Sequence, residues 1–158
     1  MNLDGPAGVR LVDAAVVAGW RPVAVFRPGE RERAAAAVAA GAVALLPRTA
    51  VLRDLLDVLA VIAAGGPGMP DDERAAWLDV HRAALAAYGT RQRLLDLLTE
   101  REFEMLQRLE RGQKAADIAV DAVVAMSTVR THIRSILVKL EVNSQQQAVA
   151  LYREARRG

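Results

Sequence analysis

The sequence contains no cysteine, which excludes disulfide bonds, thiolate zinc sites and cysteine nucleophiles. It also lacks any run of the roughly 18 uncharged apolar residues that a membrane-spanning helix requires. The N-terminus has no cationic lead, and Asp4 and Asp13 interrupt its apolar residues, unlike a secretory signal. We therefore expect a cytoplasmic protein that makes no membrane contact.

The chain has little excess charge of either sign, with a net charge of +2 over 158 residues. Residues 1–97 carry 11 basic and 11 acidic side chains, whereas residues 98–158 carry 10 and 8. This small C-terminal excess does not by itself indicate a nucleic-acid partner, because affinity depends on local clustering of charge. The hydrophobic content of 53% and charged content of 25% are those of an ordinary globular protein.

Residues 1–66 alternate between helical and strand patterns. Helices are predicted at 8–18, 30–40 and 50–64, the last capped by Thr49, and strands at 22–26 and 42–46. This order with short turns is typical of a parallel α/β sheet. Because a sheet of two strands is marginal alone, we expect this domain to need another surface to complete its core.

Residues 67–97 are predicted to be a helical linker and a candidate for dimerisation. The breaker cluster Pro67-Gly68-Met69-Pro70 marks the boundary, and the acidic run 71–73 suits the first turn of a helix. That helix is expected to run to about Tyr88, to break at Gly89-Thr90 and to resume over 91–97.

Residues 98–158 are predicted to form an all-α domain of four helices. Thr99 and Glu102 have the spacing of a capping box, and the helix they begin ends at Gly112. A short helix over 115–122 and a longer one over 126–140 follow. Ser144 caps the fourth helix.

The helix over 126–140 has two different faces. Apolar residues recur at helical spacing on one face: Val129, Ile133, Ile136 and Leu140. The other face carries two arginines among small and apolar residues: Ser127, Arg130, Thr131, Arg134 and Val138. A helix of this kind can bury one side in a bundle and present guanidinium groups to a DNA major groove.

Several segments in register carry a family resemblance: LTEREFEML from Leu98, Gly112, IA at 118–119, TVRTHIRSIL at 128–137, KL at 139–140 and VNSQQQAVAL at 142–151. They resemble the LuxR/GerE-type helix-turn-helix domain over about 55 residues. The resemblance implies that the third helix enters the major groove and that the fourth helix forms a two-fold dimer. It also implies structural roles for Glu102 and Gly112.

The resemblance assigns roles to individual residues. The implied base-reading residues are Arg130, Thr131 and Arg134. The candidate contacts to the DNA backbone are Lys114, Ser127, Thr128, His132 and Lys139. The implied dimerisation residues are Val149 and Tyr152.

Two positions depart from the family pattern. Lys114 and Ala125 stand where serines usually cap the second and third helices. Each lost cap typically costs about 1 kcal/mol. Ser127 is an alternative cap if the third helix begins later, so the sequence leaves two possible first residues for that helix.

Residues 1–66 resemble the second half of a response-regulator receiver domain, of the kind found in actinobacterial regulators. The segment from Gly41 to Arg48 is similar to a receiver strand, and Arg48 stands where the family has a lysine. The strands that carry the acidic pair and the phosphorylated aspartate are absent, and Asp4 and Asp13 do not replace them. Phosphoryl transfer to aspartate needs a metal held by neighbouring carboxylates, so no phosphorylation, metal or cofactor is expected.

The fold predicted overall is an α/β receiver remnant followed by a four-helix helix-turn-helix domain. The predicted function is sequence-specific binding of double-stranded DNA by a phosphorylation-independent homodimer that regulates transcription. No catalytic constellation is present, so an enzyme is not expected. RNA polymerase and another regulator are further candidate partners.

Two alternatives remain open. The truncated receiver half can serve as an interaction module that sequesters another regulator. Alternatively, the chain is a conventional response regulator whose start has been misplaced. Dimerisation through the fourth helix and through the open edge of the strand at 22–26 are both compatible with the sequence.

Overall fold

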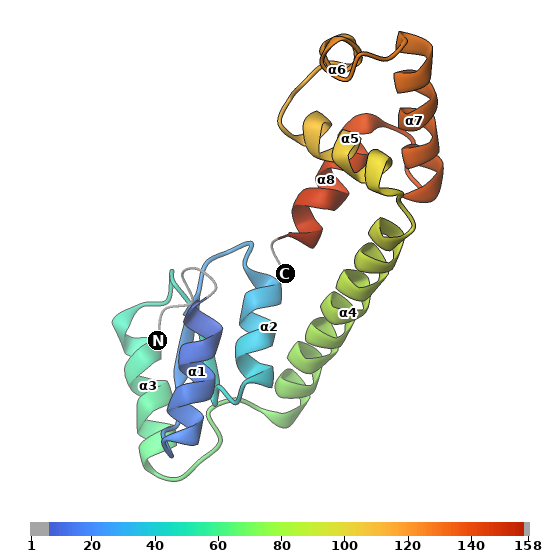
Figure 1. The fold of residues 1–158 in the computed structure, drawn as a ribbon. Helices are drawn as coiled ribbons and strands as arrows, with labels where there is room; N and C mark the ends of the chain where they lie inside the picture. Colours follow the sequence, from blue (N-terminus) through green and yellow to red (C-terminus); the bar gives the residue numbers. More distant parts are fainter. Residues whose placement is uncertain (1–6, 157–158) are drawn as a thin grey trace. The chain divides into compact units, whose positions relative to one another are not determined.

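The computed structural model describes residues 7–156, and Asp4 lies outside this range. Within it are eight helices and two strands (Figure 1). The chain divides into two compact units, Met1–Leu85 and Ala86–Gly158, which are described separately.

The N-terminal unit has the predicted alternation of helices and strands. Its elements are α1 (Ala7–Val17), β1 (Val23–Phe26), α2 (Arg31–Ala39), β2 (Ala44–Pro47) and α3 (Leu52–Ala63). The strands β1 and β2 pair in parallel, with Val23 opposite Ala44 and Phe26 opposite Pro47. The predicted two-stranded parallel α/β fold is therefore confirmed.

Small side chains bring α2 close to this sheet. The buried residues of α2 are Ala34, Ala35, Ala37 and Val38. Ala37 packs with Val12, Ala24 and Ala42 in a core that contains few large side chains. The turn after α2 uses Gly41 at a φ of 99°, where an added Cβ would lie 2.9 Å from Val16 Cγ2. Glycine is required there both by the left-handed backbone and by the close packing of α1.

Helix α3 is less well packed than α1 and α2. None of its twelve residues, all of them described, is fully buried. Arg21 holds its C-terminal end by donating hydrogen bonds to the Ile62 and Gly66 carbonyls at 3.0 and 2.7 Å. The predicted cap Thr49 is wrong, because the N-cap is Val51. The Val51 N–H donates to Asp54 Oδ2 at 3.1 Å, which fixes the later start.

Helix α4 (Asp71–Asp96) is continuous, so the predicted break at Gly89-Thr90 is wrong. One glycine in a helix costs about 1 kcal/mol relative to alanine, which is too little to end a long helix. Thr90 Oγ1 donates to the Ala86 carbonyl at 3.0 Å and so bonds within the helix instead of terminating it. The predicted limits of the linker stay a prediction, since α4 contributes to both compact units.

The C-terminal unit contains the four predicted helices. They are α5 (Glu100–Glu110), α6 (Ala115–Asp121), α7 (Met126–Lys139) and α8 (Gln145–Ala155). The predicted apolar face of α7 lies in the core, with Val129 and Ile136 fully buried. Both predicted caps are present, because Thr99 and Ser144 accept hydrogen bonds from N–H groups three residues later.

Candidate nucleic-acid interface

The face of α7 opposite the core is exposed. It presents Ser127, Arg130, Thr131 and Arg134, while Val129 and Ile133 on the other face are buried. Within the described part of the chain, neither the Arg130 nor the Arg134 guanidinium makes a hydrogen bond or ion pair. Two positive groups one helical turn apart are therefore available to an anionic partner.

Thr131 lies on the same face and is exposed. Its Oγ1 donates a hydrogen bond to the Ser127 carbonyl at 3.0 Å, one turn back along α7. Thr128 is exposed as well, and His132 is half-buried.

The start of α7 has no side-chain cap. Ala125 is the N-cap, and Ser127 lies inside the first turn of the helix, so the alternative of a Ser127 cap is wrong. The turn before α7 contains Val123 with a φ of 54°, and 90% of this residue is exposed. A β-branched residue in the left-handed region is strained, because its side chain approaches the backbone.

The second helix also begins without the family's serine. Lys114 is its N-cap and makes no side-chain capping bond, but its N–H donates to Asp117 Oδ2 at 3.3 Å. This bond satisfies the N–H of the cap residue, but the N–H groups that a serine side chain would cap receive no bond from Lys114. The Lys114 side chain is exposed.

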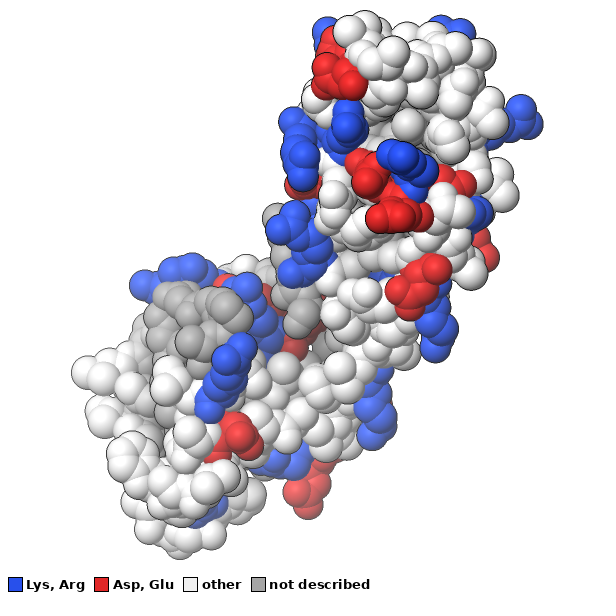
Figure 2. All heavy atoms as spheres, in the orientation of Figure 1, with Lys and Arg blue, Asp and Glu red and all other residues white. Residues whose placement is uncertain are grey.

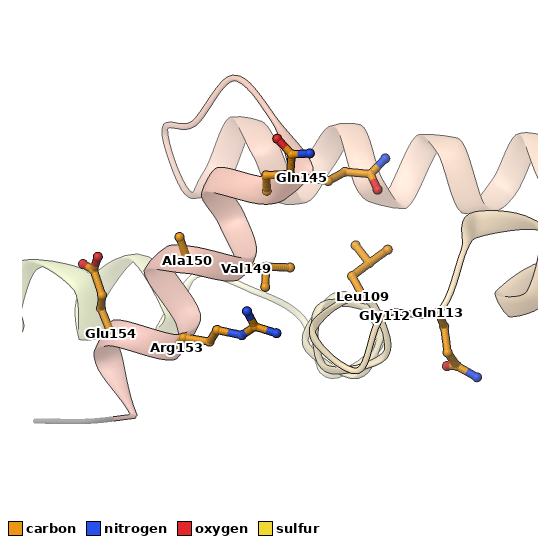
Figure 3. A pocket seen from close by; sticks show the side chains of 9 residues that line it. Leu109, Gly112, Gln113, Gln145, Val149, Ala150, Arg153 and Glu154 are labelled. Atoms are coloured by element: carbon orange, nitrogen blue, oxygen red, sulfur yellow. The ribbon is translucent and has the colours of Figure 1, made fainter.

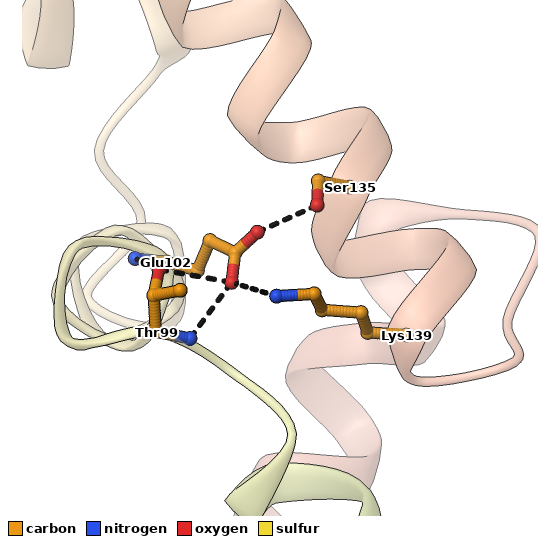
Figure 4. Close-up of polar contacts among 4 residues, drawn as sticks. All are labelled: Thr99, Glu102, Ser135 and Lys139. Carbon is orange, nitrogen blue, oxygen red and sulfur yellow. Dashed lines mark hydrogen bonds and ion pairs between the residues drawn. The ribbon is translucent and has the colours of Figure 1, made fainter.

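A buried carboxylate joins α5 to α7 (Figure 4). Glu102 is 4% exposed, and its oxygens accept hydrogen bonds from Ser135 Oγ at 2.6 Å and Lys139 Nζ at 2.7 Å. The same carboxylate accepts from the Thr99 N–H at 2.8 Å and from Thr99 Oγ1 at 3.0 Å. Glu102 therefore caps α5 and anchors α7 with one side chain.

These contacts determine the charge of Glu102. Burial raises its pKa, but the hydrogen bonds led by those from Lys139 and Ser135 outweigh burial and lower the pKa from 4.5 to about 2. The carboxylate is therefore ionised at neutral pH and pairs with the half-buried Lys139.

The family resemblance implies a structural role for Glu102, but the sequence does not show its partners on α7. Ser135 and Lys139 are four residues apart, so they lie on one side of the helix. That spacing is visible in the sequence, but the identity of the group they face is not. Lys139 was assigned to the DNA backbone, and that role stays a prediction for a side chain already bonded to Glu102.

The two predicted dimerisation residues differ in exposure. Tyr152 is 7% exposed and packs edge-on against Phe103, with ring centroids 5.6 Å apart. It therefore offers little surface to a second chain. Val149 is half-buried and lines a groove between α5 and α8, where it faces Leu109 (Figure 3).

On the face drawn in Figure 2, basic and acidic side chains are interspersed over the C-terminal unit. Among residues 7–156, no three His, Asp or Glu side chains are grouped so that they could hold a metal ion. No helix in this range is both long and apolar enough to cross a bilayer.

Comparison with known proteins identifies similarity over the C-terminal helices. A family model described as bacterial regulatory proteins, luxR family, matches residues 96–152, which include α5, α6, α7 and most of α8. Response regulator protein VraR of Staphylococcus aureus is 42% identical over 59 residues. That stretch is 37% of this chain and only 28% of VraR.

Two solved structures are similar over most of the chain. Response regulator ChrA, from a heme-sensing two-component system, is 27% identical with a TM-score of 0.41 and covers 99% of this chain. Response regulator StyR is 26% identical with a TM-score of 0.48 and covers 98%. The alignment includes 74% of each of those two chains.

Proposed function

We propose that residues 96–152, which match the model of the luxR family of bacterial regulatory proteins, form a DNA-binding domain, and that this chain is a sequence-specific transcriptional regulator that acts as a homodimer without phosphorylation. The observation that carries the proposal is the exposed face of α7. There, Arg130 and Arg134 lie free of intramolecular partners within the described residues, on a helix whose other face is buried.

The two guanidinium groups suit recognition of guanine. Residues four apart in a helix are separated by about 6 Å along its axis. A guanidinium can donate two hydrogen bonds to guanine O6 and N7, and each such pair contributes about 1–3 kcal/mol of discrimination. We assign base contacts to Arg130, Thr131 and Arg134.

Contacts to phosphates would set the position of α7 in the groove. Lys114, Ser127 and Thr128 are exposed near the starts of α6 and α7, where backbone N–H groups also favour anions. We assign backbone contacts to these three residues, and to His132 and Lys139 on α7. Lys139 would need to share its ammonium group between Glu102 and a phosphate.

The N-terminal unit supports the proposal of a homodimer. Leu52, Leu56 and Leu59 of α3 are 70%, 56% and 42% exposed. On the face drawn in Figure 2 few charged side chains lie on the α3 side of this unit, and the exposed charges of α3 include the pair Arg53 and Asp57. The two strands β1 and β2 pair only with each other among the described residues. Apolar faces and open strand edges of this kind are usually covered by another chain.

The proposal of phosphorylation independence is supported by the placement of the carboxylates. Among residues 7–156, no three His, Asp or Glu side chains are grouped so that they could hold the divalent metal that phosphoryl transfer to aspartate needs. Incubation with acetyl phosphate should therefore leave DNA affinity unchanged.

Selection of random duplex DNA by the full chain, at two salt concentrations, tests the function directly. We expect enrichment of an inverted repeat with half-site centres about one turn of DNA apart. Affinity should fall with salt because phosphate contacts release counterions. Enrichment of no sequence at either salt concentration would contradict the proposal.

A second candidate function is favoured by the exposed apolar residues of α3. In that case the N-terminal unit binds another regulator and sequesters it. Capture of a full-length regulator in heterodimers that retain no DNA would support this alternative over a self-sufficient homodimer.

A further inference from the structure

We infer that Thr131 contacts DNA through its methyl group, and that it recognises the 5-methyl group of a pyrimidine in the major groove. In unmodified DNA that pyrimidine is thymine. The inference rests on the proposed function and specifies the sequence class that α7 binds. It concerns the direct neighbour of Arg130 on the exposed face of the helix.

The hydroxyl group of Thr131 is already engaged within α7. A hydroxyl group has one proton to donate. Thr131 Oγ1 donates that proton to the Ser127 carbonyl at 3.0 Å. The side chain therefore has no donor left for a base acceptor such as guanine O6 or thymine O4.

The methyl group of Thr131 is available to a partner outside the chain. Besides its hydroxyl, threonine carries one methyl group on Cβ. The residue is exposed, and its hydroxyl is directed back along α7. The hydroxyl oxygen can still accept a hydrogen bond, whereas the methyl group is the apolar part of Thr131 that remains without a partner in this arrangement.

The two arginines beside Thr131 determine which bases suit this face of α7. Arg130 and Arg134 are donors only, and they match the acceptor atoms of guanine. An apolar group beside them matches the only apolar group on a major-groove base edge, which is the thymine methyl. We therefore expect each half-site to contain a thymine next to the guanines that the arginines contact.

The test removes a single methyl or hydroxyl group, either from the DNA or from Thr131. The full chain is first used to select its site from random duplex DNA. Dissociation constants are then measured with each half-site thymine replaced in turn by deoxyuridine, which lacks only the 5-methyl group. Removing one methyl contact should weaken binding about fourfold at one position.

Two variants of Thr131 separate its methyl group from its hydroxyl. Thr131→Val keeps a methyl and removes the hydroxyl, so it should retain affinity and the deoxyuridine effect. Thr131→Ser keeps the hydroxyl and removes the methyl, so it should bind thymine and deoxyuridine equally. Thermal unfolding of both variants verifies that α7 is intact.

A comparison of cytosine with 5-methylcytosine tests whether the methyl group itself is recognised, whichever pyrimidine carries it. With a C·G pair at the sensitive position, 5-methylcytosine should bind more tightly than cytosine to the wild type and equally to Thr131→Ser. A difference that persists in Thr131→Ser would overturn the inference.

The failures of the two proposals are distinguishable. Selection of no sequence would overturn the proposed function, and this inference with it. Selection of a site without any deoxyuridine effect would overturn this inference alone. So would loss of specificity in Thr131→Val with full specificity in Thr131→Ser, because the hydroxyl would then be the recognition group.

Discussion

At the scale of single residues, Glu102 links the start of α5 to α7. It is 4% exposed, and it receives hydrogen bonds from a hydroxyl and an ammonium group of α7. Sequence spacing alone predicted the capping box that Glu102 forms with Thr99. It did not predict the bonds to Ser135 and Lys139, because they depend on how α5 and α7 pack.

Replacing Glu102 with glutamine should lower the free energy of unfolding by about 1–3 kcal/mol, because hydrogen bonds to a charged group are lost. The matched control is Glu104→Gln. The Glu104 side chain is 49% exposed and pairs with Arg101 at 3.3 Å, a surface contact that contributes less than about 1 kcal/mol. Urea unfolding measures both changes, and equal effects of the two substitutions would contradict the role of Glu102.

The pH dependence of stability follows from the same group. The pKa of Glu102 is lowered from 4.5 to about 2 in the folded chain. In the interval between these values the unfolded state binds more protons, so stability rises with pH. The contribution of Glu102 is therefore complete above pH 4.5 and is lost as the pH falls towards 2.

Comparison of the wild type with Glu102→Gln in acid tests this prediction. The difference between their free energies of unfolding should be constant near neutral pH and should shrink below pH 4.5. A difference that stays constant through the acid range would mean that Glu102 is not held ionised by its partners.

At the scale of elements, the amphipathic helices of the C-terminal unit were predictable, whereas backbone details were not. Periodicity identified the buried face of α7, and Ser144 was identified as a cap. The continuity of α4 through Gly89 was missed, because local breaker signals are outweighed by the helix on both sides. The cap of α3 was also misplaced by two residues, since Asp54 fixes the backbone at Val51.

The turn between α6 and α7 carries backbone strain at Val123. Val123→Gly should stabilise the domain by about 1 kcal/mol, because glycine adopts a φ of 54° without steric cost. The control is Val120→Gly, at an exposed position inside α6, which should destabilise by roughly 0.3 kcal/mol, the difference between the helix propensities of valine and glycine. Thermal unfolding compares the two, and destabilisation by both would show that Val123 is not strained.

At the scale of the whole molecule, the fold class was predictable from the order of the elements, but the association surface was not. Exposed side chains can be identified only after the helices are packed. Val149 and Tyr152 were assigned from family resemblance, yet Tyr152 is mostly buried. The exposed leucines of α3 belong to the helix predicted at 50–64, and the sequence did not show which of its side chains would remain uncovered.

If α3 mediates association, Leu56→Glu should shift the full chain from dimer to monomer in sedimentation velocity. Leu56 is 56% exposed, so a charge there should disturb the monomer little. Val120→Glu is the control, since Val120 is 77% exposed on α6, outside the surfaces considered for association. Dimers that persist in Leu56→Glu would place the interface elsewhere, with the groove of α8 as the next candidate.

The central claim is that α7 recognises DNA through Arg130 and Arg134. The most direct measurement is competition between the selected duplex and a scrambled duplex for the wild type, Arg130→Ala, Arg134→Ala and the surface control Arg101→Ala. Each α7 substitution should reduce discrimination by about 1–3 kcal/mol, while Arg101→Ala should retain it. Full discrimination in both α7 variants would contradict the account.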